Sequence, residues 1–312
     1  MRPVLSVVVP VYNEEEVLQV SYARLNGVLT GLGITYELIF INDGSRDRTP
    51  EMLRELSERD ANVKVVFFSR NFGHQAAITA GMEYSSGDAV VVIDADLQDP
   101  PEVIPLMLEK WREGFDVVYG KRVKRHGETA FKKISARLFY RILRKMTVTD
   151  IPVDTGDFRL IDRKVCDTLT TFGERSRFVR GLVSWVGFKQ TSVEFIREER
   201  FAGETKYPLR KMIELSISGM VSFSNKPLRL AAFFGLVSSA SGFIWLLILL
   251  INSISGAQTE GWAVAVAIML FTQGLVFITI GIMGEYMGRI YDEVRARPYY
   301  IVRDTLGFVE KK

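Results

Sequence analysis

Two aspartates, Asp94 and Asp96, follow directly after the apolar run at residues 89–93. Such a run is typical of a buried parallel strand, so both acids are expected at the carboxyl end of that strand. In open α/β sheets, ligands bind at this edge. Two neighbouring carboxylates repel each other and favour a bound cation, and hard oxygen ligands beside a diphosphate suit Mg²⁺ or Mn²⁺. The alternative is a solvated acidic turn, and these residues alone leave both interpretations open.

Polar clusters also follow three other apolar runs, and they are Tyr12-Asn13-Glu14, Asn42-Asp43-Gly44 and Arg70-Asn71. Solvated loops explain one or two such clusters, but four in succession favour a ligand site along one edge of a sheet. No G-x-G-x-x-G follows a strand and no G-x-x-x-x-G-K-[ST] is present, so neither a dinucleotide site nor a P-loop is predicted. A nucleotide held here would depend on carboxylates for its base and ribose and on a metal for its phosphates.

The elements that position these clusters alternate along the chain. Strands are expected at residues 5–9, 36–41, 63–68, 89–93 and 116–119. Helices are expected at residues 14–32, from about residue 50, at 75–85 and at 101–113. This βαβα order predicts an α/β domain with a mostly parallel sheet and helices on both faces.

The composition excludes several classes of protein. The chain has 312 residues, a net charge of +3 and a single cysteine, Cys166. An internal disulfide is therefore excluded, and with only His74 and His126 besides, so is a Cys/His zinc site. Residues 121–145 hold ten Lys or Arg and one acid, interleaved with apolar residues at helical spacing. This pattern predicts a basic amphipathic helix for an anionic lipid phosphate, in preference to a nucleic-acid groove.

Two long apolar stretches, at about residues 228–251 and 262–287, each exceed the roughly 20 residues that span a bilayer. They predict two transmembrane helices, preceded by an amphipathic surface helix near residues 207–224. Lys and Arg flank the pair on its outer sides, which predicts a multi-pass inner-membrane protein with both termini and the catalytic domain in the cytoplasm. Small residues four apart, such as Gly284 and Gly288, are compatible with a homo-oligomer.

Four motifs together carry a family resemblance, and they are residues 9–14 (VPVYNE), 42–45 (NDGS), 69–73 (SRNFG) and 94–100 (DADLQDP). The chain resembles the inverting glycosyltransferases of family 2 over essentially its whole length. More narrowly, it resembles polyprenyl-phosphate glycosyltransferases, which include bactoprenol glucosyltransferases and dolichol-phosphate mannosyltransferases. The resemblance implies a GT-A, Rossmann-like domain at residues 1–206, a juxtamembrane helix at 207–227, a transmembrane hairpin at 228–288 and a tail at 289–312.

The resemblance also implies roles for particular residues. Those implied for the nucleotide-sugar donor are Pro10, Tyr12, Glu14, Asp43, Arg70 and Asp94. Asp96 is implied as the metal ligand, helped by Asp94 and Gln98. Those implied for the acceptor phosphate are Arg122, Lys132, Lys133, Ser135, Arg200 and Lys206. Asp157, in a GDFRL segment, would orient the sugar or the acceptor, so the implied catalytic residues are Asp96, Asp157 and Arg122.

The sequence departs from the family pattern after Gly73. His74-Gln75 stands where many relatives have Lys-Glu, which weakens any transfer of sugar contacts to these two positions. A second difference is conservative, since Thr205 stands where Ser is usual and keeps the hydroxyl.

The predicted reaction moves one sugar, with inversion, from a nucleotide-sugar to polyprenyl (undecaprenyl) phosphate. The favoured donor is UDP-glucose, and GDP-mannose, UDP-N-acetylglucosamine and an aminoarabinose-type donor are alternatives. Because a phosphate oxygen is already ionised at neutral pH, this acceptor needs no strong general base. A processive polysaccharide synthase and a non-catalytic nucleotide-sugar sensor are the rival interpretations.

Overall fold

The computed structural model describes residues 3–123, 155–174, 179–198 and 261–308, together with residues 233, 237, 240, 244, 247, 251 and 254. The predicted basic helix from residue 124 onward and the amphipathic helix near residues 207–224 lie outside the described residues. So do five of the predicted acceptor residues, which are Lys132, Lys133, Ser135, Arg200 and Lys206.

One sheet organises the described part of the chain, and its eight strands run in the order β7-β5-β6-β4-β1-β2-β3-β8. The strands are β1 (Leu5–Val11), β2 (Tyr36–Asn42), β3 (Val63–Phe68), β4 (Ala89–Val92), β5 (Val117–Arg122), β6 (Thr155–Asp162), β7 (Gln190–Phe195) and β8 (Val302–Leu306). β1 pairs in parallel with β2 and β4, β2 with β3, and β5 with β7. β6 is antiparallel to β4 and β5, and β8 is antiparallel to β3.

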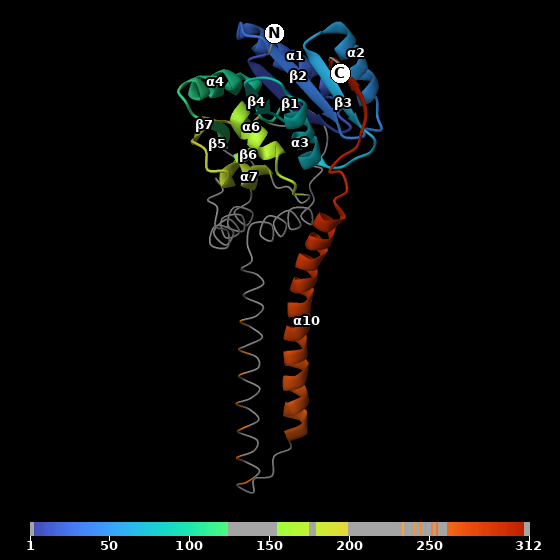
Figure 1. The fold of residues 1–312 in the computed structure, drawn as a ribbon, viewed down its shortest axis with the longest axis vertical. Helices are drawn as coiled ribbons and strands as arrows, with labels where there is room; N and C mark the ends of the chain where they lie inside the picture. The colour runs from blue at the N-terminus through green and yellow to red at the C-terminus, as the bar shows by residue number, and fades with distance from the viewer. Residues whose placement is uncertain are drawn as a thin grey trace.

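Helices cover both faces of this sheet (Figure 1). α1 (Leu18–Gly31), α2 (Thr49–Arg59), the 3₁₀ turn η1 (Pro101–Val103) and α4 (Ile104–Arg112) share one apolar core with the sheet. α3 (His74–Tyr84), α6 (Arg163–Thr170) and α7 (Val179–Trp185) share the other. Alternate residues of a strand face opposite sides, so Val7 and Val9 of β1 enter the first core while Val8 enters the second.

The predicted α/β core with a mostly parallel sheet is present, and the five predicted strands lie within a few residues of their expected positions. Three strands were not predicted. β6 contains Asp157 and Arg159, both buried, so its sequence lacks the apolar run of a buried strand. β8 reads Val-Arg-Asp-Thr-Leu and pairs at the edge of the sheet, where a polar strand is tolerated.

The last helix, α10 (Gly261–Arg295), projects from the sheet domain, and its C-terminal end lies next to that domain, where the chain returns to the sheet (Figure 1). After the return, the ring of Tyr300 stacks on Phe68 with centroids 4.9 Å apart. Arg54 of α2 donates to Asp304 of β8 at 2.9 Å. The C-terminal residues are thus part of the sheet domain.

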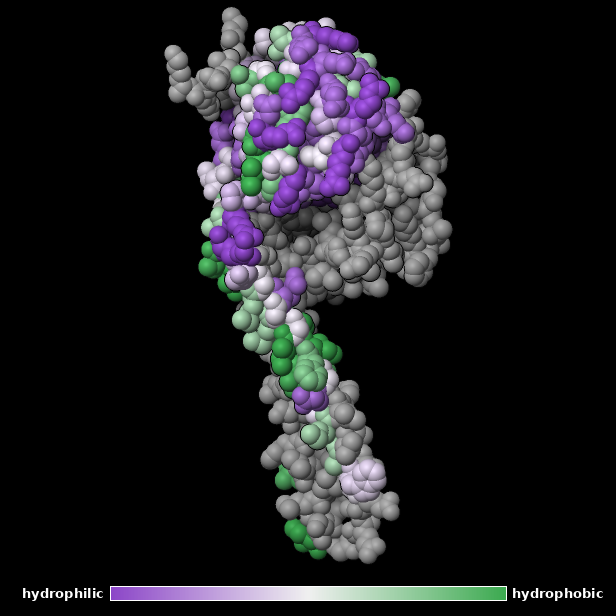
Figure 2. Space-filling model, turned by 90° about the vertical axis from the view of Figure 1, so that its right-hand side faces the viewer, coloured by the Kyte–Doolittle hydropathy of each residue, from purple (hydrophilic) through white to green (hydrophobic). Residues whose placement is uncertain are grey.

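The described residues contradict the predicted pair of transmembrane helices, and with it the predicted multi-pass inner-membrane protein. Most of the first predicted stretch, residues 228–251, lies outside the described residues. Within the described part of the chain, no helix combines the length and the apolarity that crossing a bilayer requires. The second predicted stretch, residues 262–287, lies within α10, a continuous helix of 35 residues that goes on through Glu293 to Arg295. Apolar side chains are nevertheless exposed along α10, among them Trp262, Met269, Met287 and Val294. Figure 2 shows green, hydrophobic patches along this helix below a largely purple sheet domain.

Candidate active site

A crevice of the α/β type is expected between the carboxyl ends of β1 and β4. The chain adds β2 and β3 on one side of β1 and then returns to place β4 on the other side. Ligands of open α/β sheets bind where the strand order reverses in this way. The order β4-β1-β2-β3 also sets all four predicted polar clusters side by side at one edge.

The loops after β1 and β2 are bound to each other. The amide of Asn13 donates to Ser45 Oγ and that of Glu14 to Thr49 Oγ1, each at 2.9 Å. Asn13 has a φ of 53°, a left-handed conformation that Asn tolerates better than most residues. Pro10 is buried in β1, and Tyr12 and Glu14 are half-buried just after it.

Asp43 joins the loop after β2 to the loop after β3. Its carboxylate accepts from the amides of Phe72 at 2.6 Å and Gly73 at 2.9 Å. Burial raises the pKa of Asp43, although the two amides oppose that change. Gly44 is needed beside it, because its φ is +69° and an added Cβ would lie 2.6 Å from the amide nitrogen of Asn71. Asp43, which was predicted to bind the nucleotide-sugar, therefore also fixes the conformation of the loop that contains Arg70.

The turn after β4 presents the acid pair. Leu97 has a φ of 59°, and the amide of Gln98 donates to Asp96 Oδ1 at 3.2 Å. Within the described residues, Asp94 Oδ1 is buried and has no hydrogen-bond partner. Burial raises the pKa of Asp94 to about 6, and the carboxylates of Asp157 and Asp96 act in the same direction. Such an oxygen needs a cation or a donor.

Asp94 and Asp96 suit a metal ion whose remaining coordination positions are filled by the phosphates of a bound substrate. In the described residues, no three or more His, Cys, Asp or Glu side chains are arranged to hold a metal by themselves. Mg²⁺, however, is commonly held by one or two carboxylates together with substrate phosphates and water. Asp96 and the Oδ1 atom of Asp94 offer such a pair. The third predicted ligand, Gln98, has its side-chain oxygen bound by Arg197 Nη2 at 2.7 Å.

Asp157 lies on β6, the strand next to β4. β4 and β6 pair with Val92 opposite Arg159, and two further residues along this antiparallel register bring Asp94 opposite Asp157. The Asp157 side chain is only 5% exposed and accepts from Arg180 Nε at 2.7 Å and Nη2 at 2.8 Å. Although burial opposes ionisation, Arg180 and His74 hold the pKa of Asp157 well below its usual range.

His74, the first residue of α3, lies between the two acids. Its Nε2 atom is 3.2 Å from Asp157 Oδ2 and 3.5 Å from Asp94 Oδ1. Burial lowers the pKa of His74, but the two carboxylates outweigh it and raise the pKa to about 9. The imidazole is therefore a cation that faces both acids.

A second cluster of charge surrounds Asp99. Arg122 Nη2 lies 3.2 Å from both oxygens of this buried carboxylate, and Arg197 Nε lies 3.9 Å from Oδ1. Gly156 leaves room for Arg122, since an added Cβ would lie 2.5 Å from its Nη2. Two guanidinium groups around one carboxylate leave an excess of positive charge, which suits an anionic ligand.

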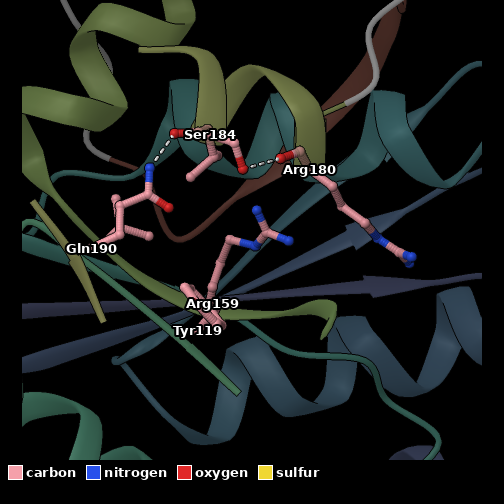
Figure 3. Close-up of a pocket in the computed structure, with 7 residues that line it drawn as sticks. Tyr119, Arg159, Arg180, Ser184 and Gln190 are labelled. Carbon is pink, nitrogen blue, oxygen red and sulfur yellow. Dashed lines mark hydrogen bonds between the residues drawn. The ribbon is translucent and has the colours of Figure 1, made fainter. Parts of the chain in front are cut away.

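Behind Asp157, Arg159 points from β6 into a small cavity beneath α7 (Figure 3). Its Nη2 donates to the carbonyl of Gly156 at 2.7 Å, and burial lowers its pKa to about 10. The cavity wall is held by Gln190 donating to Val183 O at 2.8 Å and Ser184 to Arg180 O at 3.2 Å (Figure 3). These bonds fix the helix from which Arg180 reaches Asp157.

The structure thus brings together the predicted residues Asp94, Asp96 and Asp157, and places Arg122 beside Asp99. Sequence reasoning missed four charged residues of the site, which are His74, Asp99, Arg180 and Arg197. His74 had a signal, since it departs from the family motif. Arg180 and Arg197 had none, because their partners are brought near by pairing between distant strands.

Comparison with known proteins agrees with this geometry. The profile of "Glycosyl transferase family 2" matches residues 6–170. The uncharacterized glycosyltransferase YkcC of Bacillus subtilis (strain 168) is 56% identical over 98% of this chain and 95% of its own length. A SfII prophage-derived bactoprenol glucosyl transferase of Shigella flexneri is 40% identical over 96% of this chain and 98% of its own.

Strand-end acids in a mostly parallel α/β sheet, together with these matches, define the class as a glycosyltransferase. The chain belongs to glycosyl transferase family 2. The family resemblance carried by the four sequence motifs is confirmed.

Proposed function

We propose that this enzyme transfers a single glucose, with inversion, from UDP-glucose to a polyprenyl phosphate such as undecaprenyl phosphate. The observation that carries the proposal is the placement of Asp94 and Asp96 at the crevice, across the register from Asp157, in a chain that is 40% identical to a bactoprenol glucosyl transferase. Metal-side acids and a sugar-side acid are then available within one site.

The donor would lie over the carboxyl ends of β1, β2 and β4. Pro10, Tyr12, Glu14 and Asp43 would hold its base and ribose, and Arg70 would lie beside the diphosphate. Arg70 is exposed, and its guanidinium lies 4.1 Å from the centre of the Phe72 ring, next to the loop that Asp43 binds. UDP-glucose is the favoured donor because a relative that is 40% identical is named a glucosyl transferase.

Asp96 and Asp94 would hold Mg²⁺ or Mn²⁺, which would neutralise negative charge on the departing diphosphate. Gln98, whose side-chain oxygen accepts from Arg197, would join them through the second lone pair of that oxygen. Asp157 would orient the sugar, since its carboxylate is ionised and fixed by Arg180. Neither acid has to act as a base, because the attacking phosphate oxygen is already ionised.

The acceptor phosphate would approach the positive cluster around Asp99. Arg122 lies there in the described structure, and Arg197 adds a second guanidinium. Lys132, Lys133, Ser135, Arg200 and Lys206 complete the proposed acceptor side. Holding the phosphate in line with the departing diphosphate converts the encounter into a single displacement, which inverts the anomeric carbon.

A donor panel tests this proposal. The purified protein is incubated with undecaprenyl phosphate, Mg²⁺ or Mn²⁺, and one radiolabelled donor at a time: UDP-glucose, GDP-mannose or UDP-N-acetylglucosamine. The expected result is label in extracted lipid with UDP-glucose above the others. Label that appears with a different donor would replace glucose in the proposal, and a complete lack of lipid label with every donor would overturn it.

Two rivals predict different products. A processive synthase would yield a polymer of many sugars, whereas the proposed reaction stops after one. A nucleotide-sugar sensor would bind the donor without labelling lipid. The acid pair and the positive cluster around Asp99 favour the transferase, because a sensor has no need of an acceptor-side charge.

A further inference from the structure

The imidazole of His74 lies beside acids from both halves of the proposed site. Asp94 belongs to the metal side, at the end of β4. Asp157 belongs to the sugar side, in β6. His74 lies at the start of α3, a third element, and its Nε2 atom is within 3.5 Å of an oxygen of each acid.

The chemistry of this contact is set by its partners. An ionised carboxylate can only accept a hydrogen bond, so Nε2 must carry the hydrogen that faces Asp157 Oδ2 at 3.2 Å. The same edge of the ring faces Asp94 Oδ1, which is buried and has no hydrogen-bond partner in the described part of the chain. Without the imidazole, two like charges would face each other across neighbouring strands.

The position of the ring is itself fixed. Gly73 precedes α3 and its amide donates to Asp43, while the side chain of Gln75 accepts from the amide of Val179 on α7 at 3.0 Å. His74 is therefore anchored on both sides, toward the donor loop and toward the helix that carries Arg180.

We infer that His74 is a positioning residue that bridges Asp94 and Asp157, so that the metal-side and sugar-side acids keep one separation during transfer. This inference rests on the proposed function for the roles of the two acids. It assigns His74 no contact with the reacting atoms. The Nε2 atom of His74 donates to Asp157 and faces Asp94 Oδ1 at 3.5 Å, an interaction with two carboxylates that a lysine could also make and an apolar ring could not.

Double-mutant cycles test the bridge. The variants are His74→Phe, which keeps a ring but loses the donor, Asp94→Asn, Asp157→Asn and the two doubles. Removing one well-placed polar contact in an active site costs on the order of 10²-fold in kcat/KM. If His74 bridges the acids, each double should lose at least tenfold less than the product of its singles, because contacting residues are not additive. Additive losses in either cycle would overturn the bridge.

Rescue separates positioning from simple packing. His74→Lys keeps a cationic donor, so it should retain kcat within about tenfold of the wild type, while His74→Phe should not. Glu83→Gln, at the far end of the same helix, is the matched control and should keep wild-type kcat. Equal losses in His74→Lys and His74→Phe would show a packing role and contradict the inference.

Thermal stability without metal tests the inference independently of enzyme activity. Thermal unfolding in EDTA is compared for His74→Phe, Asp157→Asn and their double variant. Coupling between the two substitutions is expected, and independent shifts in the unfolding temperature would contradict the bridge. A wild-type protein that labels no lipid would defeat the proposed function, whereas this unfolding cycle would still decide the bridge.

Discussion

Arg180 donates two hydrogen bonds to the buried carboxylate of Asp157, from Nε to Oδ1 at 2.7 Å and from Nη2 to Oδ2 at 2.8 Å. The two residues come from different elements, α7 and β6, and the pairing is the fork geometry in which arginine binds carboxylates most strongly. It ties the helix above the sheet to the acid that faces Asp94. The position of Asp157 is therefore fixed by α7, in addition to the hydrogen bonds between the loops of the site.

Replacing Arg180 should damage both stability and turnover. Arg180→Ala leaves Asp157 buried with one cationic partner fewer, and breaking a buried pair in this way typically costs about 3 kcal/mol. Arg180→Lys should recover less than half of that loss, since an ammonium cannot bind both oxygens as a fork. Urea unfolding measures the effect, with the exposed Lys110→Ala as the control. An Arg180→Ala protein as stable as the control would contradict this account of the pair.

Asp96→Asn should remove most of the activity. The substitution keeps the shape of the side chain but removes the charge that would hold the cation, and a loss on the order of 10²-fold or more in kcat is expected. Added Mg²⁺ should not restore it. Full turnover of the Asp96→Asn protein at ordinary Mg²⁺ concentrations would exclude Asp96 as the metal ligand.

A buried carboxylate far from the site predicts acid sensitivity. Glu37 accepts from Ser6 Oγ and Lys64 Nζ, each at 2.5 Å, and from the amide of Ser86 at 2.6 Å. Although burial opposes ionisation, these donors lower the pKa of Glu37 from its ordinary 4.5. A lowered folded-state pKa means that the stabilisation is complete above about 4.5 and is lost as the pH falls through the folded-state value.

The variant Glu37→Gln isolates this contribution. Wild type should be more stable than Glu37→Gln at neutral pH, and the difference in the free energy of unfolding should shrink as the pH falls below about 4.5. Urea unfolding at several pH values measures it. A difference that stays constant down to pH ~3 would show that Glu37 is not responsible.

Cys166 should be unreactive in the folded protein. Its side chain is fully buried, and burial raises the pKa of the thiol to about 11. Because the thiolate is the reactive form, a maleimide at mildly alkaline pH should label the native chain very slowly and the urea-unfolded chain at once. Rapid labelling of the native protein would show that the core around α6 opens.

Part of this architecture was predictable, because short runs of neighbouring residues determine it. The runs at residues 63–68 and 89–93 are apolar enough to predict buried strands, and the polar residues after them mark the ligand edge. β6 escaped prediction because Asp157 and Arg159 interrupt it, and their charges are tolerated only through partners such as Arg180. His74 and Asp157 are 83 positions apart in the chain, so no sequence pattern announces their contact.

The transmembrane prediction depended on hydropathy alone. Hydropathy averages a run of residues, and it does not determine how far the resulting helix extends. α10 runs for 35 residues from Gly261 to Arg295, beyond the apolar stretch and into charged sequence. The chain then pairs β8 with β3, a contact that no local pattern in residues 302–306 indicates.

The most direct test of the central claim is the mass of the lipid product. Wild-type protein, UDP-glucose, undecaprenyl phosphate and Mg²⁺ are incubated, and the extracted lipid is examined by mass spectrometry beside an Asp96→Asn control. The account predicts undecaprenyl phosphate heavier by one hexose with the wild type and unchanged lipid with the variant. Unmodified lipid from the wild type, or a lipid that carries a chain of hexoses, would contradict it.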